Sequence, residues 1–230
     1  YLDQINLQEA LDYWDIDNGN IPNSENILLV AVDVGVDWTH EDLISNIWQN
    51  LDEDVDNDGK TIECNGTVVN NQCDGTWELD PDDLNGIDDD NWDGNESTFI
   101  DDLIGWDFVG DSGNYDNDPK PVLEDNFHVS WNHGTHVAGI LSAKTNNQLG
   151  ISSSAFNGKI MPLKCAMEGS ESNLTVVNGY DAMLYAAKKG YYSDYQTIIN
   201  ASWGGEILSQ LELEVISHIS ENYEAIIVSS

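Results

Sequence analysis

The hydrophobic positions of this chain alternate between short continuous runs and longer periodic stretches. A continuous apolar run at residues 28–32 predicts a buried strand, and further strands are predicted over residues 159–165, 197–202 and 225–228. Apolar residues at helical spacing predict helices over residues 137–143, 175–189 and 208–222, with a shorter helix within 40–48. Strands and helices that alternate in this way are typical of an α/β fold, with a mostly parallel sheet flanked by helices.

The charge of the chain narrows its possible partners. The 230 residues suffice for one α/β domain, and they carry 43 acidic residues against seven lysines, a formal net charge of -36. Such a surface repels nucleic acid and anionic lipid, so we expect neither as a partner. No apolar stretch approaches ~18 residues, and no membrane span is predicted. The charge suits an exterior where cations screen or bind carboxylates.

Two segments combine hydrophobic patterning with candidate chemistry. The run 28–32 leads into Asp33, which places a carboxylate at the carboxyl end of a strand, where open α/β sheets have their sites. The segment 132–139, Asn-His-Gly-Thr-His-Val-Ala-Gly, puts His133 at or just before the start of the small, apolar helix. The partial positive charge of a helix N-terminus favours a neutral imidazole, which can act as a base.

Together these segments resemble the subtilisin-like serine peptidases, the subtilases. The resemblance rests on residues 31–36 (Ala-Val-Asp-Val-Gly-Val), with 39–43 (Thr-His-Glu-Asp-Leu), and on 133–139. It implies that Asp33 is the family's aspartate and His133 its general base, in the chain order found in subtilisin. The chain departs from the family at Val34, where a serine or threonine usually supports the carboxylate.

The resemblance also implies what lies around this pair. Ser202, Trp203 and Gly204 match the segment that lines the substrate, where an extended backbone pairs with a peptide. Residues 226–230 resemble the strand before the oxyanion-hole asparagine, so that asparagine and the nucleophilic serine are expected beyond Ser230. Residues 1–230 are then the N-terminal portion of a catalytic domain, with a sheet incomplete at its C-terminal end. Expected partners are protein or peptide substrates, and either a propeptide or the protein's own cleaved C-terminal portion.

Residues 51–125 form an acidic segment with 24 acidic residues and two lysines. Two loops in it place oxygen-bearing side chains at alternate positions before a glycine, a spacing suited to a hard cation such as calcium. The expected ligands are Asp54, Asp56 and Asp58 in the first loop, and Asp89, Asn91 and Asp93 in the second. Neither loop has the glutamate that closes an EF-hand, so we expect closing ligands elsewhere, such as Asp101 or Asp102. The resemblance adds Asp42 as a further calcium ligand.

The three cysteines indicate whether the protein works in an oxidising or a reducing compartment. A disulfide between Cys64 and Cys73 would close a small loop in the acidic segment and fits secretion into an oxidising exterior. Cys165 follows a predicted strand, which favours a buried free thiol over a nucleophile.

Three functions remain open from the sequence. The first is a secreted, calcium-dependent serine endopeptidase that forms an acyl-enzyme, although this segment alone would be inactive. The second is a catalytically inactive calcium-binding module that keeps the fold. The third is a zinc hydrolase that uses Asp33, His128, His133 and His136, but the spacing between the histidines offers no general-base glutamate.

Overall fold

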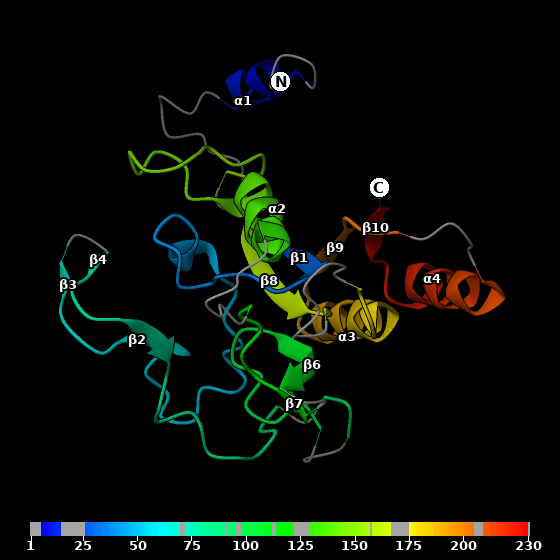
Figure 1. Ribbon diagram of the computed structural model, residues 1–230, viewed down its shortest axis with the longest axis horizontal. Coiled ribbons are helices and arrows are strands. Elements are labelled where there is room, and N and C mark those ends of the chain that lie inside the picture. Colours follow the sequence, from blue (N-terminus) through cyan, green and yellow to red (C-terminus); the bar gives the residue numbers. More distant parts are fainter. Residues whose placement is uncertain are drawn as a thin grey trace.

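A six-stranded sheet forms the centre of the computed structural model (Figure 1). The structure describes residues 6–14, 26–69, 72–90, 92–94, 98–111, 114–121, 129–156, 158–166, 175–204 and 209–229. In spatial order the strands are β10 (Ile226–Ser229), β9 (Gln196–Ala201), β1 (Ile27–Asp33), β8 (Lys159–Lys164), β6 (Trp106–Asp111) and β7 (Asn114–Asp116). All neighbours pair in parallel except β6 and β7, which are antiparallel. The carboxyl ends of β1, β8 and β9 therefore meet at one edge of the sheet.

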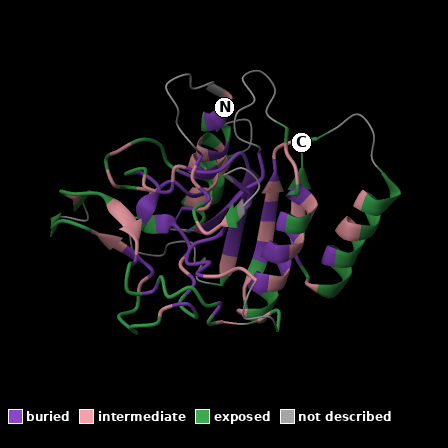
Figure 2. Cartoon of the chain, turned by 60° about the horizontal axis from the view of Figure 1, so that its bottom comes forward, coloured by how far each residue is buried: buried purple, intermediate pink, exposed green. Residues whose placement is uncertain are grey.

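Helices cover both faces of this sheet. Along β1, Leu28, Val30 and Val32 pack in one core cluster with helix α3 (Gly179–Tyr192), which also contacts β9. The alternate residues Leu29 and Ala31 pack on the opposite face with Ala138 of helix α2 (His133–Ser142). Helix α4 (Gln210–Asn222) lies outside α3 and β10 and is mostly exposed (Figure 2). Both faces of β1 are therefore buried, which explains why its sequence is a continuous apolar run.

The predicted α/β architecture is confirmed, with three differences in detail. Helix α3 begins at Gly179 and not at 175, because Asn178 has a left-handed backbone with φ 56° that cannot continue a helix. The helix expected within 40–48 is only the 3-10 turn Ile44–Asn46. Strands β6 and β7 were not predicted, because β6 carries a polar and charged sequence, Trp-Asp-Phe-Val-Gly-Asp, that lacks a clear strand period.

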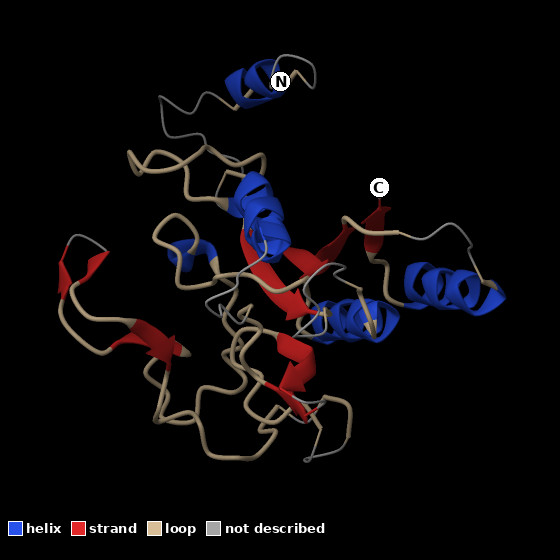
Figure 3. Cartoon of the chain, in the orientation of Figure 1, coloured by secondary structure: helices blue, strands red, loops and turns tan. Residues whose placement is uncertain are grey.

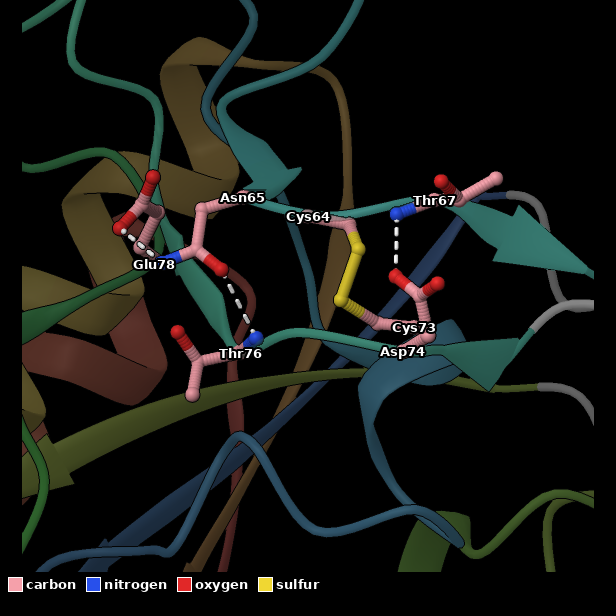
Figure 4. Close-up of a disulfide and its surroundings, with 7 residues drawn as sticks. All are labelled: Cys64, Asn65, Thr67, Cys73, Asp74, Thr76 and Glu78. Carbon is pink, nitrogen blue, oxygen red and sulfur yellow. Dashed lines mark hydrogen bonds between the residues drawn. A yellow bond between two sulfur atoms is a disulfide. The ribbon is translucent and has the colours of Figure 1, made fainter.

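The acidic segment is mostly loop (Figure 3). It contains two small antiparallel pairs: β2 (Ile62–Cys64) with β5 (Trp77–Leu79), and β3 (Val68–Val69) with β4 (Gln72–Cys73). A disulfide joins Cys64 to Cys73, as expected, and closes this exposed hairpin (Figure 4). At the base of the segment, the Asn50 amide donates to the Leu103 carbonyl at 2.8 Å, so the excursion returns to its starting point.

Two further elements complete the described part of the chain. Near its start lies the short helix α1 (Leu7–Asp12), and the 3-10 turn Val129–Asn132 leads directly into α2. Among the described residues, no helix is both long and apolar enough to cross a bilayer.

Candidate active site

Asp33 is the last residue of β1, and its side chain is almost fully buried, with 2% exposed. Its Oδ1 accepts hydrogen bonds from the Val34 amide at 2.8 Å and contacts His133 Nδ1 at 2.8 Å. Oδ2 lies 3.0 Å from the same ring nitrogen. Burial raises the pKa of the Asp33 carboxyl, whereas the hydrogen bonds from His133 and Val34 act in the opposite direction.

His133 is the first residue of α2, and about half of its side chain (49%) is exposed to solvent. The Asp33 carboxylate faces Nδ1, which fixes the ring and makes Nδ1 the donor. The other ring nitrogen, Nε2, is then left as a proton acceptor. A buried carboxylate that orients an imidazole and leaves Nε2 as an acceptor is an arrangement that can take a proton from a nucleophile.

Gly134 permits the close approach of the two residues. A methyl group at this position would lie 2.2 Å from the Gly35 carbonyl oxygen and 3.1 Å from Asp33 Cβ. The first turn of α2 therefore rests directly on the chain that leaves β1. Thr135 adds a second link between the two elements, because its hydroxyl accepts a hydrogen bond from the Asp37 amide at 2.9 Å.

The predicted substrate-lining residues follow β9 at the same edge of the sheet. Ser202 and Trp203 are partly buried and Gly204 is exposed. The indole of Trp203 donates to the Val32 carbonyl of β1 at 2.8 Å and meets the Tyr180 ring edge-on, with 5.6 Å between ring centroids. Trp203 is thus anchored one residue from Asp33, which fixes a large aromatic surface beside the site.

The first predicted calcium loop brings its three carboxylates together. One oxygen from each of Asp54, Asp56 and Asp58 lies within 4.8 Å of the other two. Backbone hydrogen bonds close the same loop, because the Asp58 and Gly59 amides donate to the Asp54 carboxylate at 3.2 and 2.8 Å. Three convergent carboxylate oxygens suit calcium.

The second loop and Asp42 have different surroundings. Asp89 and Asp93 belong to none of the three-residue acidic groups that the described residues form, and Asn91 lies outside the described residues. The buried Asp42 carboxylate accepts hydrogen bonds from Asn147 Nδ2 at 2.7 Å and from the Ile151 amide at 2.9 Å. Asp42 therefore holds the 144–151 loop against the 40–48 segment.

Asp102, expected as a closing ligand, lies instead in a separate buried acidic cluster with Glu53 and Asp90, two residues that the loop spacing did not predict. The ammonium of Lys189, from α3, forms an ion pair with Asp90 and lies 3.7 Å from Asp102. Burial raises the pKa of Glu53 to about 8 and lowers that of Lys189 to about 7. One sequence signal could have pointed to this cluster: two adjacent lysines stand at the end of a predicted helix. The chain has only seven lysines, so a buried acidic group has few possible cationic partners.

The described residues support neither a cysteine nucleophile nor a zinc centre. Cys165 is free and fully buried, and burial raises the pKa of its thiol well above the usual range, so it stays protonated. None of the described groups of metal-ligating side chains includes a histidine. His136 is exposed on α2, and His128 lies outside the described residues.

Solved structures similar to this one are proteases. The chain superposes on "Sphericase" with a TM-score of 0.53 and 19% identity, over 90% of this chain and 46% of the other. It superposes equally on "S41 Psychrophilic Protease", with a TM-score of 0.53, 17% identity, and coverage of 89% and 45%. The fold is that of the subtilisin-like proteases.

The sequence model of the subtilase family matches residues 24–230, and the chain therefore belongs to this family. It is 30% identical over 167 residues to "Subtilisin-like protease 1" of Plasmodium falciparum (isolate 3D7), covering 71% of this chain and 18% of the relative. It is 28% identical over 194 residues to "Thermophilic serine proteinase" of Bacillus sp. (strain AK1), covering 84% and 29%. For "Thermitase" of Thermoactinomyces vulgaris the identity is 36% over 104 residues, covering 45% and 30%. The chain thus spans less than a third of each of these relatives.

Proposed function

We propose that this chain is the N-terminal portion of the catalytic domain of a secreted serine endopeptidase, and that Asp33 and His133 are two members of its triad. The observation that carries the proposal is the 2.8 Å contact between the buried Asp33 carboxylate and His133 Nδ1 in a chain of the subtilase family. His133 Nε2 takes the proton of the nucleophilic serine as that serine attacks the peptide carbonyl. Asp33 orients the ring and stabilises the imidazolium that forms.

The serine that completes the triad is proposed to lie outside these 230 residues. The acyl-enzyme would therefore form only in the intact protein, and the chain by itself would be inactive. A peptide substrate is proposed to run along Ser202, Trp203 and Gly204, with its backbone extended beside the end of β9. The disulfide between Cys64 and Cys73 supports secretion, because such bonds persist in oxidising compartments.

Calcium is the proposed cofactor, and it is structural. Asp54, Asp56 and Asp58 would hold it in the first loop, and the net charge of -36 leaves the acidic segment short of positive partners. Bound calcium would supply charge that lets these carboxylates converge without repulsion. The proposal also keeps the other calcium ligands that the sequence predicts, which are Asp42, Asp89, Asn91 and Asp93.

The experiment that tests the proposal compares His133→Ala with His136→Ala in the intact protein. We expect His133→Ala to lower kcat by several orders of magnitude, because triad members act as a unit. His136 is exposed on the same helix, so His136→Ala provides a matched control and should keep kcat near the parent value. Equal peptide hydrolysis by the His133→Ala variant and the parent would refute the assignment.

A serine-directed fluorophosphonate probe provides a second test of the same proposal. Label should appear on the intact protein outside residues 1–230, and it should be lost on denaturation before labelling. Label within residues 1–230 would overturn the placement of the nucleophile. An intact, folded protein that takes no label at all would favour the catalytically inactive binding module.

A further inference from the structure

A cavity of about 860 Å³ lies between strands β6 and β7 and the start of helix α3. Four of the side chains that line it are aromatic: Phe99, Trp106, Phe108 and Tyr115. Three others are acidic: Asp101, Asp116 and Asp181. None of the seven lysines lines the cavity, and the chain contains no arginine. Such a lining favours an organic cation, because carboxylates and the faces of aromatic rings both attract positive charge.

The cavity lies at the edge of the sheet that carries the proposed catalytic pair. Asp107 of β6 and Asp33 of β1 are register partners of the same β8 residue, Lys164, so β6 begins level with the end of β1. Phe108 and the residues after it therefore lie beyond the level of Asp33. The Asn178 side chain, at the start of α3, donates to the Phe108 carbonyl at 2.8 Å and joins the two walls of the cavity.

The first turn of α3 connects the cavity to the proposed substrate path. Asn178 and Asp181 line the cavity, and the two residues between them contact Trp203 of the substrate-lining segment. The Tyr180 ring meets the indole edge-on, with 5.6 Å between centroids, and a methyl group at Gly179 would lie only 2.6 Å from Trp203 Cζ2. One helical turn is about 5.4 Å long, so a peptide beside Trp203 passes the cavity within reach of a long side chain.

Asp116 and Asp181 are the carboxylates best placed to meet a cation. Asp181 is exposed in the first turn of α3, where its charge offsets the positive helix N-terminus that would otherwise repel a cation. Asp116 is half-buried, and its Oδ1 accepts from the Asp118 amide at 3.0 Å. Both oxygens of Asp101 instead accept from the Gly86 amide at 3.1 Å, so Asp101 contributes mainly its charge.

The surroundings of Asp116 leave it short of positive charge. The pKa of its carboxyl is raised, because burial and the charge of Asp107 outweigh the Asp118 amide and Lys164. The Lys164 ammonium donates to Asp107 Oδ2 at 2.7 Å and does not line the cavity. Neither Asp116 nor Asp181 belongs to a three-residue acidic group among the described residues, which favours an organic cation over a metal ion.

We propose that this cavity is a subsite that binds an arginine side chain of the peptide substrate. This inference rests on the proposed function. Arginine fits because its planar guanidinium can stack on aromatic rings while its N–H groups donate to carboxylates. Phe99 and Tyr115 are the accessible rings of the lining, and Asp116 and Asp181 are the acceptors.

The test measures kcat/KM of the intact protein on peptides in which arginine, or its neutral isostere citrulline, occupies each position in turn. We expect one position at which arginine is preferred at least about tenfold, mainly through a lower KM, because a contact remote from the reacting bond acts on ground state and transition state alike. Asp116→Asn and Asp181→Asn should each reduce this preference at least about threefold. The preference is a ratio measured on one preparation, so a loss of folded protein does not change it.

Two further variants separate the cavity from the general negative charge of the protein. Glu221→Gln removes an exposed carboxylate of α4, which does not line the cavity, and it changes the net charge equally. It should leave the preference for arginine unchanged, and a loss equal to that of Asp181→Asn would refute the inference. Asp181→Lys reverses the charge of the subsite and should favour glutamate over glutamine at the same position.

A binding measurement distinguishes this inference from the proposed function. Calorimetry on the His133→Ala variant should show that the arginine peptide binds about tenfold more tightly than the citrulline peptide. If the parent hydrolyses no peptide, the proposed function fails, and this measurement still decides whether the cavity binds arginine. Equal binding of the two peptides, equal hydrolysis at every position, or a preference that survives both Asp116→Asn and Asp181→Asn would overturn the inference.

Discussion

Replacement of Gly134 by alanine tests the geometry of the proposed site most directly. The added methyl group would lie 2.2 Å from the Gly35 carbonyl oxygen, whereas a carbon–oxygen contact needs roughly 3.3 Å. Both atoms that it meets belong to rigid parts of the site, the backbone at Gly35 and the Cβ of Asp33. Neither can move away as the end of a flexible side chain can. The first turn of α2 must therefore shift by about 1 Å relative to β1.

This shift acts on the bond between Asp33 and His133. A displacement of about 1 Å along the contact would lengthen the 2.8 Å separation beyond hydrogen-bonding range. A misplacement of this size costs roughly 100-fold in rate, or about 2.7 kcal/mol of transition-state stabilisation. Overpacking of the interface between α2 and β1 should also lower the free energy of unfolding by about 1–3 kcal/mol.

The assay measures kcat of the intact protein and the midpoint of thermal unfolding, with Gly139→Ala as the control. Gly139 lies on the same helix, and a methyl group there would meet only Ile151 Cδ1, at an ordinary 3.7 Å. Gly139→Ala should keep kcat and raise stability by up to about 1 kcal/mol, since alanine favours helix. A Gly134→Ala variant with the kcat and stability of the parent would refute the reasoning.

Three further predictions concern the acidic segment. Millimolar calcium should raise the melting temperature and a chelator should lower it, because calcium binds the folded loop that contains Asp54; equal melting curves would contradict this. In chelator, stability should fall as pH rises from about 5 to 7, because burial raises the pKa of Glu53 from 4.5 to about 8 and the folded state holds the proton that the unfolded chain releases. A stability that instead rises with pH over this range would refute the argument. Cys64→Ser/Cys73→Ser should speed proteolysis within the hairpin but leave kcat unchanged, because the bond closes an exposed loop far from Asp33 in the chain.

The parts of the fold that could be predicted are those in which local sequence and burial agree. Residues 28–32 form a continuous apolar run because β1 is covered on both faces, and the pattern needs no distant information. The pair of Asp33 and His133 was also accessible, because each sits at the end of a clearly patterned element. Their contact and roles came from the family resemblance and not from periodicity.

The parts that could not be predicted depend on contacts between distant residues. Strand β6 is held by its pairing with β8, and the buried carboxylate of its Asp107 forms an ion pair with Lys164 of that strand. Nothing near Asp107 in the sequence reveals that partner. The same holds for Lys189, which meets the acidic cluster from a helix about a hundred residues away. Loop spacing identified the carboxylates around Asp56, but it missed Glu53 and Asp90 of the buried cluster.

The hydrogen bond between Asn50 and Leu103 has a consequence for the order in which the chain folds. Asp33 and His133 are 100 residues apart, and their encounter must close a loop of that length. The Asn50 side chain also bonds Asp102, 52 residues away, so the acidic excursion between them can close first. The remaining loop is then about half as long, which lowers the closure cost by about 0.6 kcal/mol and speeds the encounter roughly threefold. Cations that hasten the early closure would then act on the refolding rate as well as on the melting point.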